Sequence, residues 1–167
     1  RRNLLCDRIA AVDADVVCLQ EVAPVSFLDD FAFMKDLGYH GQELFKRGRF
    51  RPATFWKTER CELVAPPVHK DRTLLTAFRR TKSANTETSP QTAKPKNEKH
   101  RHERFWYVLN CHLQAGPQAP RRLRQIHEGS RAVLTLARKL KEPNPEQNLA
   151  LIVCGDFNGG AECGAVR

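Results

Sequence analysis

The stretch that decides the fold is residues 149–158, which read LALIVCGDFN. A short apolar run of this kind, from Leu149 to Cys154, is typical of a buried strand. Asp156 and Asn158 follow directly, so polar side chains stand at the carboxyl end of that strand. The pair Asn158-Gly159 is also a strong turn signal, and a turn without chemistry remains an alternative at this site.

Two earlier stretches are built in the same way. Residues 15–20 read DVVCLQ and precede Glu21, and residues 105–111 read FWYVLNC and precede His112. Because active sites gather where strand ends meet at one edge of a layered sheet, the three placements together predict one shared site. Taken singly, Glu21 is also compatible with a cap for the next helix, and His112 with a satisfied structural histidine.

The order of the elements indicates an α/β fold in a single domain over residues 1–167. Apolar spacing predicts a helix at 3–13, a second that carries Phe27 to Leu37 and stops at Gly38, and a long third at 119–141. Strands are expected at 15–20, 105–111 and 149–154, and around 40–46, 52–57, 61–65 and 72–79. Helices before and after a run of strands argue for packed layers of sheet and helix. For the 119–141 helix, helical spacing predicts an inner face of Leu123, Ile126, Ser130, Val133, Leu134, Ala137 and Leu140.

Composition excludes some classes of protein. No apolar stretch is long enough to cross a membrane, and Arg1-Arg2 is not followed by a signal-peptide core. The six cysteines include no CxxC pair, so we expect free thiols, with a disulfide or zinc role as the alternative. This cysteine usage fits an intracellular location, cytoplasmic or nuclear. The chain starts without Met on a helical pattern, and we expect it to be a piece of a longer protein.

The positive charge is concentrated in two segments. The net charge is +9, of which residues 79–104 carry +5 and residues 121–141 carry +6. Residues 81–104 contain no large apolar residue, which predicts a disordered basic insertion between two strands. Arg124, Arg131 and Arg138 recur every seven residues and should form a basic stripe on the helix. Both features favour a polyanionic partner, although solvated surfaces alone would also explain them.

The three strand ends together suit metal-assisted hydrolysis of a phosphoester. Glu21 and Asp156 are carboxylates, and Mg²⁺ binds one or two of these together with waters and substrate phosphates. His112 can contact a phosphate oxygen or carry a proton near neutral pH. An EF-hand loop starting at Asp156 is excluded because Ala161 occupies the glycine position, and no GxxxxGK[ST] phosphate loop occurs.

The motifs resemble those of the endonuclease/exonuclease/phosphatase superfamily, the fold of deoxyribonuclease I and of abasic-site endonucleases. The matching strings are DVVCLQE (15–21), NCHL (110–113) and GDFN (155–158), in family order. GRFRPATFWKTERCELV (48–64) looks like the middle hairpin of the family. Arg122 and Gln125 are similar to the Arg-x-x-Gln stretch of members related to nocturnin and the deadenylases.

This resemblance implies a four-layer αββα sandwich. The family opens with a strand bearing an Asn and closes with a Ser-Asp-His motif, and neither occurs in residues 1–167. We therefore expect a partial domain with an incomplete sheet, inactive on its own.

The resemblance also implies roles for individual residues. Glu21 would bind Mg²⁺, with Mn²⁺ as an alternative metal, and His112 would contact the scissile phosphate. Asp156 would orient or activate the attacking water, and Asn158 would position phosphate and metal. Arg122 and Gln125 would bind substrate.

The expected function is therefore that of a Mg²⁺-dependent nuclease or phosphodiesterase with a phosphate-containing substrate. The basic segments favour nucleic acid as that substrate. A phosphatase acting on inositol phosphates or phospholipids is one alternative. The other is a non-catalytic module that keeps the fold and binds polyanions or proteins.

Overall fold

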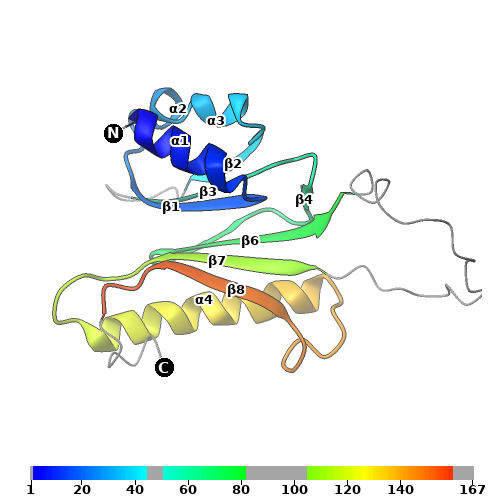
Figure 1. Cartoon of the computed structure of the whole chain (residues 1–167). Coiled ribbons are helices and arrows are strands. Elements are labelled where there is room, and N and C mark those ends of the chain that lie inside the picture. The colour runs from blue at the N-terminus through cyan, green and yellow to red at the C-terminus, as the bar shows by residue number, and fades with distance from the viewer. Residues whose placement is uncertain (1, 45–50, 82–104, 160–167) are drawn as a thin grey trace, which may run out of the picture.

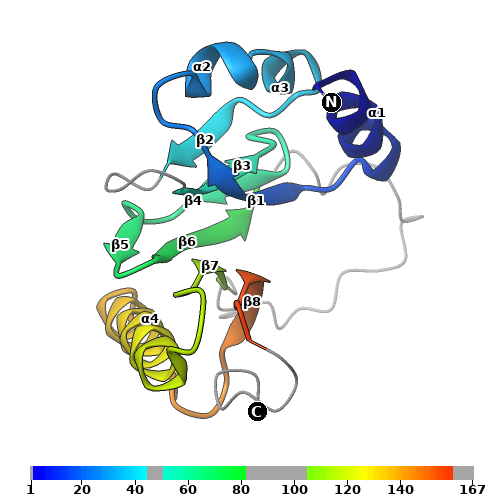
Figure 2. The ribbon, with the colours of Figure 1, turned by 90° about the vertical axis from the view of Figure 1, so that its left-hand side faces the viewer.

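The computed structural model describes residues 2–44, 51–81 and 105–159, and its elements stack in four layers (Figure 1). The first layer holds three helices, α1 (Arg2–Val12), α2 (Phe27–Asp30) and α3 (Phe33–Asp36). Two sheets follow, and α4 (Ala119–Lys139) forms the last layer. A view turned by 90° shows the same order, with α1 to α3 and α4 on opposite sides of the paired sheets (Figure 2).

The first sheet has the strand order β1-β3-β2 and is antiparallel. Its strands are β1 (Val16–Val22), β2 (Gly41–Leu44) and β3 (Arg51–Trp56). The pairing of β1 with β3 is regular from Val16 to Leu19 and then shifts before Val22. Glu21 lies within this irregular step, at the end of β1.

In the described part of the chain the second sheet has five strands, in the order β4-β6-β7-β8 with β5 also paired to β6. They are β4 (Cys61–Leu63), β5 (Val68–Lys70), β6 (Thr73–Arg80), β7 (Trp106–His112) and β8 (Ala150–Asp156). β7 and β8 are parallel and α4 connects them, because parallel strands require a crossover connection. In this register His112 lies opposite Asp156.

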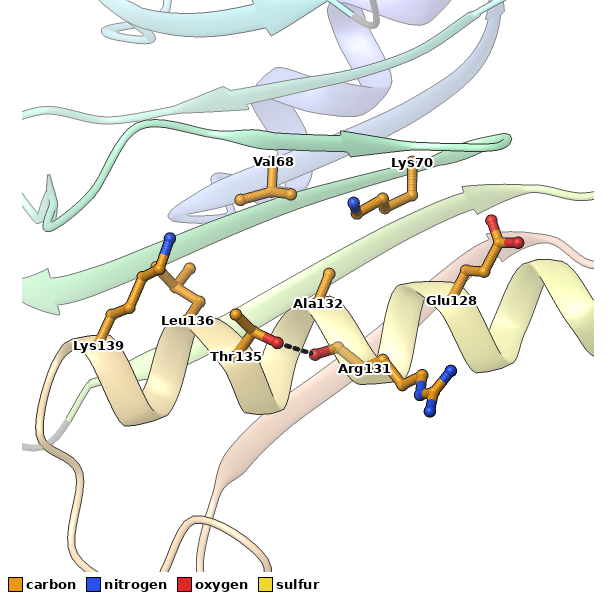
Figure 3. Close-up of a pocket in the computed structure, with 8 residues that line it drawn as sticks. All are labelled: Val68, Lys70, Glu128, Arg131, Ala132, Thr135, Leu136 and Lys139. Carbon is orange, nitrogen blue, oxygen red and sulfur yellow. Dashed lines mark hydrogen bonds between the residues drawn. The ribbon is translucent and has the colours of Figure 1, made fainter.

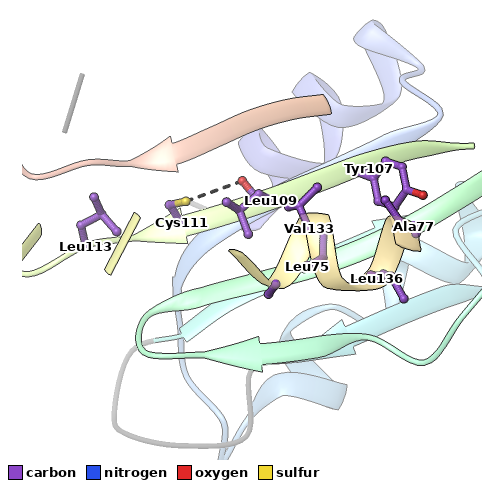
Figure 4. Close-up of a cluster of buried hydrophobic side chains, with 10 residues drawn as sticks. Leu75, Ala77, Tyr107, Leu109, Cys111, Leu113, Val133 and Leu136 are labelled. Atoms are coloured by element: carbon purple, nitrogen blue, oxygen red, sulfur yellow. Dashed lines mark hydrogen bonds between the residues drawn. The ribbon is translucent and has the colours of Figure 1, made fainter. Parts of the chain in front are cut away.

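Three apolar clusters hold the layers together. The first joins α1, α2 and α3 to the first sheet, around Met34 and Phe55. The second lies between the sheets, around Trp56 and Phe78, whose ring centroids are 5.4 Å apart. The third joins the second sheet to α4, around Leu109 and Val133 (Figure 4). Each large side chain buried in these clusters contributes about 1.5–3 kcal/mol.

The second helix differs from the sequence prediction, because α2 and α3 are separate short helices. In one continuous helix Phe33 would lie about 120° around the axis from Phe27. The turn between the two helices lets both rings join the cluster on the first sheet. Gly38 ends the segment with φ of +86°, as predicted.

The predicted inner face of α4 was partly wrong. Val133 and Ala137 are buried as expected, but Leu123 is 40% exposed. The buried face instead begins with Arg122 and Gln125 and continues through Gly129, Ala132 and Leu136. Polar side chains can be buried when they are hydrogen-bonded, and both of these are.

The last strand is more exposed than the sequence predicted. The apolar run of β8 forms a strand, but Leu151, Ile152 and Val153 are 38%, 52% and 39% exposed. The reason is that β8 is the edge strand among the described strands of its sheet, while α4 packs against β5, β6 and β7. β5 itself was not predicted, because three residues after two prolines carry little strand signal.

The structure tests the expectations for the cysteines and for membrane-spanning helices in the described residues alone. The described cysteines, Cys6, Cys18, Cys61, Cys111 and Cys154, are free thiols. Within residues 2–44, 51–81 and 105–159, no helix is long and apolar enough to span a membrane. The expected insertion at 81–104 lies outside the described residues, apart from Thr81.

Candidate active site

Three ionisable side chains from both sheets converge at one edge of the sandwich. Nε2 of His112 lies 3.9 Å from Oε1 of Glu21 and 3.9 Å from Oδ2 of Asp156. Glu21 comes from the first sheet, and His112 and Asp156 come from neighbouring strands of the second. The structure therefore brings together the three strand ends that the sequence singled out.

Unusual backbone conformations direct these side chains. Glu21 has φ of +56° at the irregular step of β1, so its carboxylate leaves the regular alternation of the strand. Gly155 has φ of +125°, and a Cβ there would lie 2.0 Å from the carbonyl oxygen of Cys111. Only glycine allows β8 to approach β7 so closely before Asp156.

His112 is held rigidly and has its two ring nitrogens in different surroundings. Its backbone N–H donates to the carbonyl of Arg72 at 2.9 Å, and the residue is only 7% exposed. Nδ1 is buried, and within the described part of the chain it has no hydrogen-bond partner. Nε2 is therefore the ring atom that faces the two carboxylates.

Asp156 and Asn158 form a local turn that fixes one oxygen of the carboxylate. The backbone N–H of Asn158 donates to Oδ1 of Asp156 at 2.8 Å. The side-chain amide of Asn158 donates to the carbonyl of Leu113 at 2.9 Å, and so ties this turn to the segment after β7. Asp156 thus keeps Oδ2 toward His112 while its other oxygen is occupied.

A buried amide aligns the two sheets beneath the site. Asn110 is fully buried on β7, and its side-chain N–H₂ donates to the carbonyl of Ala53 at 2.9 Å and to that of Leu19 at 3.3 Å. Its side-chain oxygen accepts a hydrogen bond of 2.9 Å from Nε2 of Gln20. Gln20 precedes Glu21 and Asn110 lies two residues before His112, so this bridge links the strands that carry the site.

Gln20 and Asn110 lie within the sequence motifs, but the sequence predicted no role for either residue. The available signal was a polar residue inside an apolar strand, since buried polar groups need partners. The partner could not be named before the two sheets were placed together.

Arg122 and Gln125 lie on the first turns of α4 and organise the segment after β7. Arg122 donates to the carbonyls of Gln114 and Gly116, at 3.2 and 2.6 Å. Gln125 accepts from the backbone N–H of Gln114 and donates to Oδ2 of Asp71, each at 2.9 Å. Their expected role in substrate binding stays a prediction beside this structural one.

Cys111, which precedes His112 in the chain, is fully buried. Burial raises the pKa of Cys111 to about 12, so this thiol is protonated at neutral pH. A protonated thiol is a poor nucleophile, which disfavours a cysteine–histidine pair at this site.

The carboxylates match the number and type of ligands that Mg²⁺ takes from proteins. The side chains of Glu21 and Asp156 are 68% and 45% exposed, and both face His112. The described residues contain no group of three or more His, Cys, Asp or Glu that could hold a metal ion by themselves. Mg²⁺ binds through one or two carboxylates and completes its shell with waters and phosphate, so this donor set fits that ion.

Comparison with known proteins identifies both a family and a fold. The model of the endonuclease/exonuclease/phosphatase family matches residues 1–167, the whole chain. The structure is similar to the catalytic domain of human nocturnin with a bound sulfate anion, at 22% identity and a TM-score of 0.66. This chain is covered to 99% and nocturnin to 59% in that comparison.

Two further solved structures show the same likeness. ANGEL2, a 2′,3′-cyclic phosphatase in complex with adenosine-2′,3′-vanadate, is 21% identical with a TM-score of 0.64, covering 97% of this chain and 45% of that one. D. rerio TDP2 in complex with a single-strand DNA product is 21% identical with a TM-score of 0.60, covering 99% and 56%. The chain thus spans about half the length of these structures, and the likeness shows a deoxyribonuclease I-like fold.

Proposed function

This chain belongs to the endonuclease/exonuclease/phosphatase family of phosphoester hydrolases, and we propose from that premise that it contributes the catalytic site of a Mg²⁺-dependent phosphodiesterase or nuclease. The observation that carries the proposal is the convergence of Glu21, His112 and Asp156. Packing alone gives no reason for three ionisable strand ends to meet across two sheets.

Each residue has a separate task in the proposed reaction. Bound at the Glu21 carboxylate, Mg²⁺ would supply charge neutralisation at the phosphate, and Mn²⁺ could replace it. Asp156 would orient the attacking water through Oδ2, because its Oδ1 is occupied by the Asn158 N–H. His112 would direct Nε2 at a phosphate oxygen.

The hydrogen bonds of Asn158 refine its proposed role. Its amide N–H₂ is engaged by the Leu113 carbonyl, whereas no donor among the described residues reaches its side-chain oxygen. That oxygen is an acceptor and so suits a cation or a water better than a phosphate. We therefore assign Asn158 to the metal side of the site.

A nucleotide-containing phosphoester is the proposed substrate class. Two structures of similar fold hold such ligands, a single-strand DNA product and an adenosine-2′,3′-vanadate. Arg124 is exposed near the start of α4 and adds positive surface for a polyanion. Inositol phosphates and phospholipids carry the same phosphate chemistry and are the competing substrates.

The test is a hydrolysis assay with matched variants. The longest natural chain that contains these residues is assayed with Mg²⁺ against single-stranded RNA, single-stranded DNA and bis(p-nitrophenyl) phosphate. Glu21→Ala and Asp156→Asn should each lower kcat/KM by at least about 10²-fold. The controls Glu59→Ala and Asp36→Asn remove exposed carboxylates elsewhere and should leave the rate unchanged.

Metal binding gives a readout that does not depend on turnover. Calorimetric titration with Mn²⁺ should show binding to wild type that Glu21→Ala weakens and Glu59→Ala does not. If wild type hydrolyses none of the three substrates but loses binding to an oligonucleotide steeply with salt, a non-catalytic polyanion-binding module replaces this proposal.

A further inference from the structure

A groove lies between β5 and α4, on the outer face of the second sheet (Figure 3). Its volume is about 350 Å³, and it shares no lining residue with the site at the edge of the sandwich. Its lower wall is the part of α4 from Glu128 to Lys139, and Val68 and Lys70 of β5 face this wall. Any ligand bound here would therefore be recognised independently of the proposed chemistry.

The floor of the groove is aliphatic. Ala132 and Leu136 are almost fully buried on α4, and Val68 is half-buried on β5. None of the described lining residues is aromatic. A nucleobase would have no aromatic ring to stack on, whereas a branched aliphatic side chain would contact the three aliphatic side chains of the floor.

Three exposed cations surround this floor, and no ion pair within the described chain neutralises them. Lys70 stands on β5, and Arg131 and Lys139 stand on α4, about 12 Å apart along the helix axis. By contrast, Arg138 of the same helix pairs with Glu146 at 2.5 Å. A ligand that fits this groove would place an apolar group on the floor and negative charges on either side of it, because complementary charges favour binding.

We propose that this groove binds an acidic peptide segment, with one aliphatic side chain among Val68, Ala132 and Leu136 and carboxylates at Lys70, Arg131 and Lys139. Glu128 is the one acidic residue of the described lining and lies nearest the N-terminus of α4. Because Glu128 repels carboxylates at that end, the peptide carboxylate at Lys139 is the least opposed of the three. The hydroxyl of Thr135 donates to the carbonyl of Arg131 at 2.8 Å, which leaves its oxygen as an acceptor for a peptide N–H.

The experiment measures binding by fluorescence polarisation. The probe is a fluorescein-labelled decapeptide in which pairs of glutamates alternate with single leucines. A second peptide of the same charge carries serine at each leucine position. Wild type should bind the leucine peptide saturably, with Kd below about 100 µM, and the serine peptide at least tenfold more weakly.

A pair of matched variants localises the binding. Arg131→Glu should weaken the leucine peptide at least tenfold, and Lys139→Glu likewise. Arg124→Glu makes the same charge change two turns earlier on α4, outside the groove, and should change Kd less than twofold. Thermal melting curves that match wild type establish that each variant is folded.

Three results would overturn the proposal. The first is no saturable binding of the leucine peptide by wild type. The second is an equal loss in Arg124→Glu and Arg131→Glu, which would mean charge attraction without a groove. The third is direct binding of labelled single-stranded DNA to wild type that Arg131→Glu weakens as much as it weakens the leucine peptide, which would make the groove a nucleic-acid contact instead.

Discussion

Asn110 is fully buried and hydrogen-bonds from β7 to β1 and β3 beneath the site. Its side chain donates to carbonyls on β1 and β3 at once, so removal would take a hydrogen bond from each of these strands. We expect Asn110→Ala to lower the free energy of unfolding by about 2–3 kcal/mol. Urea unfolding measures this.

Asn148→Ala is the matched control for that substitution, since Asn148 is exposed. It should change the free energy of unfolding by less than about 0.5 kcal/mol. Equal effects of the two substitutions would show that the bridge between the sheets adds nothing.

Gly155 should tolerate no side chain. Gly155→Ala combines a positive φ with a contact of 2.0 Å to the backbone of Cys111, whereas Gly116 has φ of +77° and open space around it. Both alanine variants should lose stability, Gly116→Ala by about 1 kcal/mol and Gly155→Ala by clearly more. Thermal unfolding compares them, and a smaller loss at Gly155 would contradict the close approach of β8 to β7.

For single residues, the sequence identifies those at strand ends as parts of the site more readily than the buried polar residues inside strands. Glu21, His112 and Asp156 stand out because each interrupts an apolar run, and the structure brings them together. Gln20 and Asn110 are equally polar, but their partner belongs to the other sheet, at a sequence separation of 90 residues. No local pattern contains that information.

At the scale of elements, Arg122 connects α4 to the segment that follows β7. Arg122→Ala would free the carbonyls of Gln114 and Gly116 and should speed amide hydrogen exchange over residues 114–118 at least tenfold. The expected loss of stability is about 1–3 kcal/mol. Exchange measured by mass spectrometry tests this, with Arg124→Ala as the exposed control on the same helix.

Unchanged exchange in Arg122→Ala would show that its hydrogen bonds to the backbone are not needed to order this segment. The substrate-binding role expected from the sequence would then be the better account of Arg122.

The elements themselves were mostly predictable, while the faces of α4 were not. Helical spacing located α4 because its apolar residues recur over many turns. It placed Leu123 on the inner face, whereas the structure leaves Leu123 40% exposed and buries Arg122 instead. Hydrophobicity alone gives the wrong rotation of α4 about its axis, because two buried polar residues, Arg122 and Gln125, begin its inner face. Backbone groups and Asp71 satisfy the hydrogen bonds of these two side chains.

At the scale of the whole molecule, the interior thiols should make folding sensitive to alkaline pH. Burial raises the pKa of Cys61 to about 11 and that of Cys111 to about 12, from an ordinary value of 9.0. The folded state therefore keeps these thiols protonated where the unfolded state has lost the protons. Their contribution to stability is full below pH 9 and is lost as pH rises toward 11 to 12.

Urea unfolding at pH 8 and pH 10 should show this loss, and Cys111→Ala should show a smaller one. Cys6→Ala, at a half-buried position on α1, is the control and should lose as much as wild type. The same loss in all three proteins would assign the alkaline effect to other groups.

The division of the strands into two sheets lay beyond the sequence. Strand signals at 52–57 and 72–79 are alike, yet β3 belongs to the first sheet and β6 to the second. Only packing decides this, since Trp56 and Phe78 meet between the sheets. The local patterns predicted packed layers of sheet and helix, and the resemblance to a known family supplied their four-layer αββα order.

The pairing of β6 with β7 has a practical consequence for protein engineering. These neighbouring strands are antiparallel, with Phe78 opposite Trp106, and no described strand lies between them in the chain. A chain divided between Thr81 and Phe105 would therefore yield two pieces with complementary strand edges, one carrying Glu21 and the other His112 and Asp156. Such a pair is the starting point for a split reporter, in which Glu21 is brought back to His112 and Asp156 only when the two pieces meet.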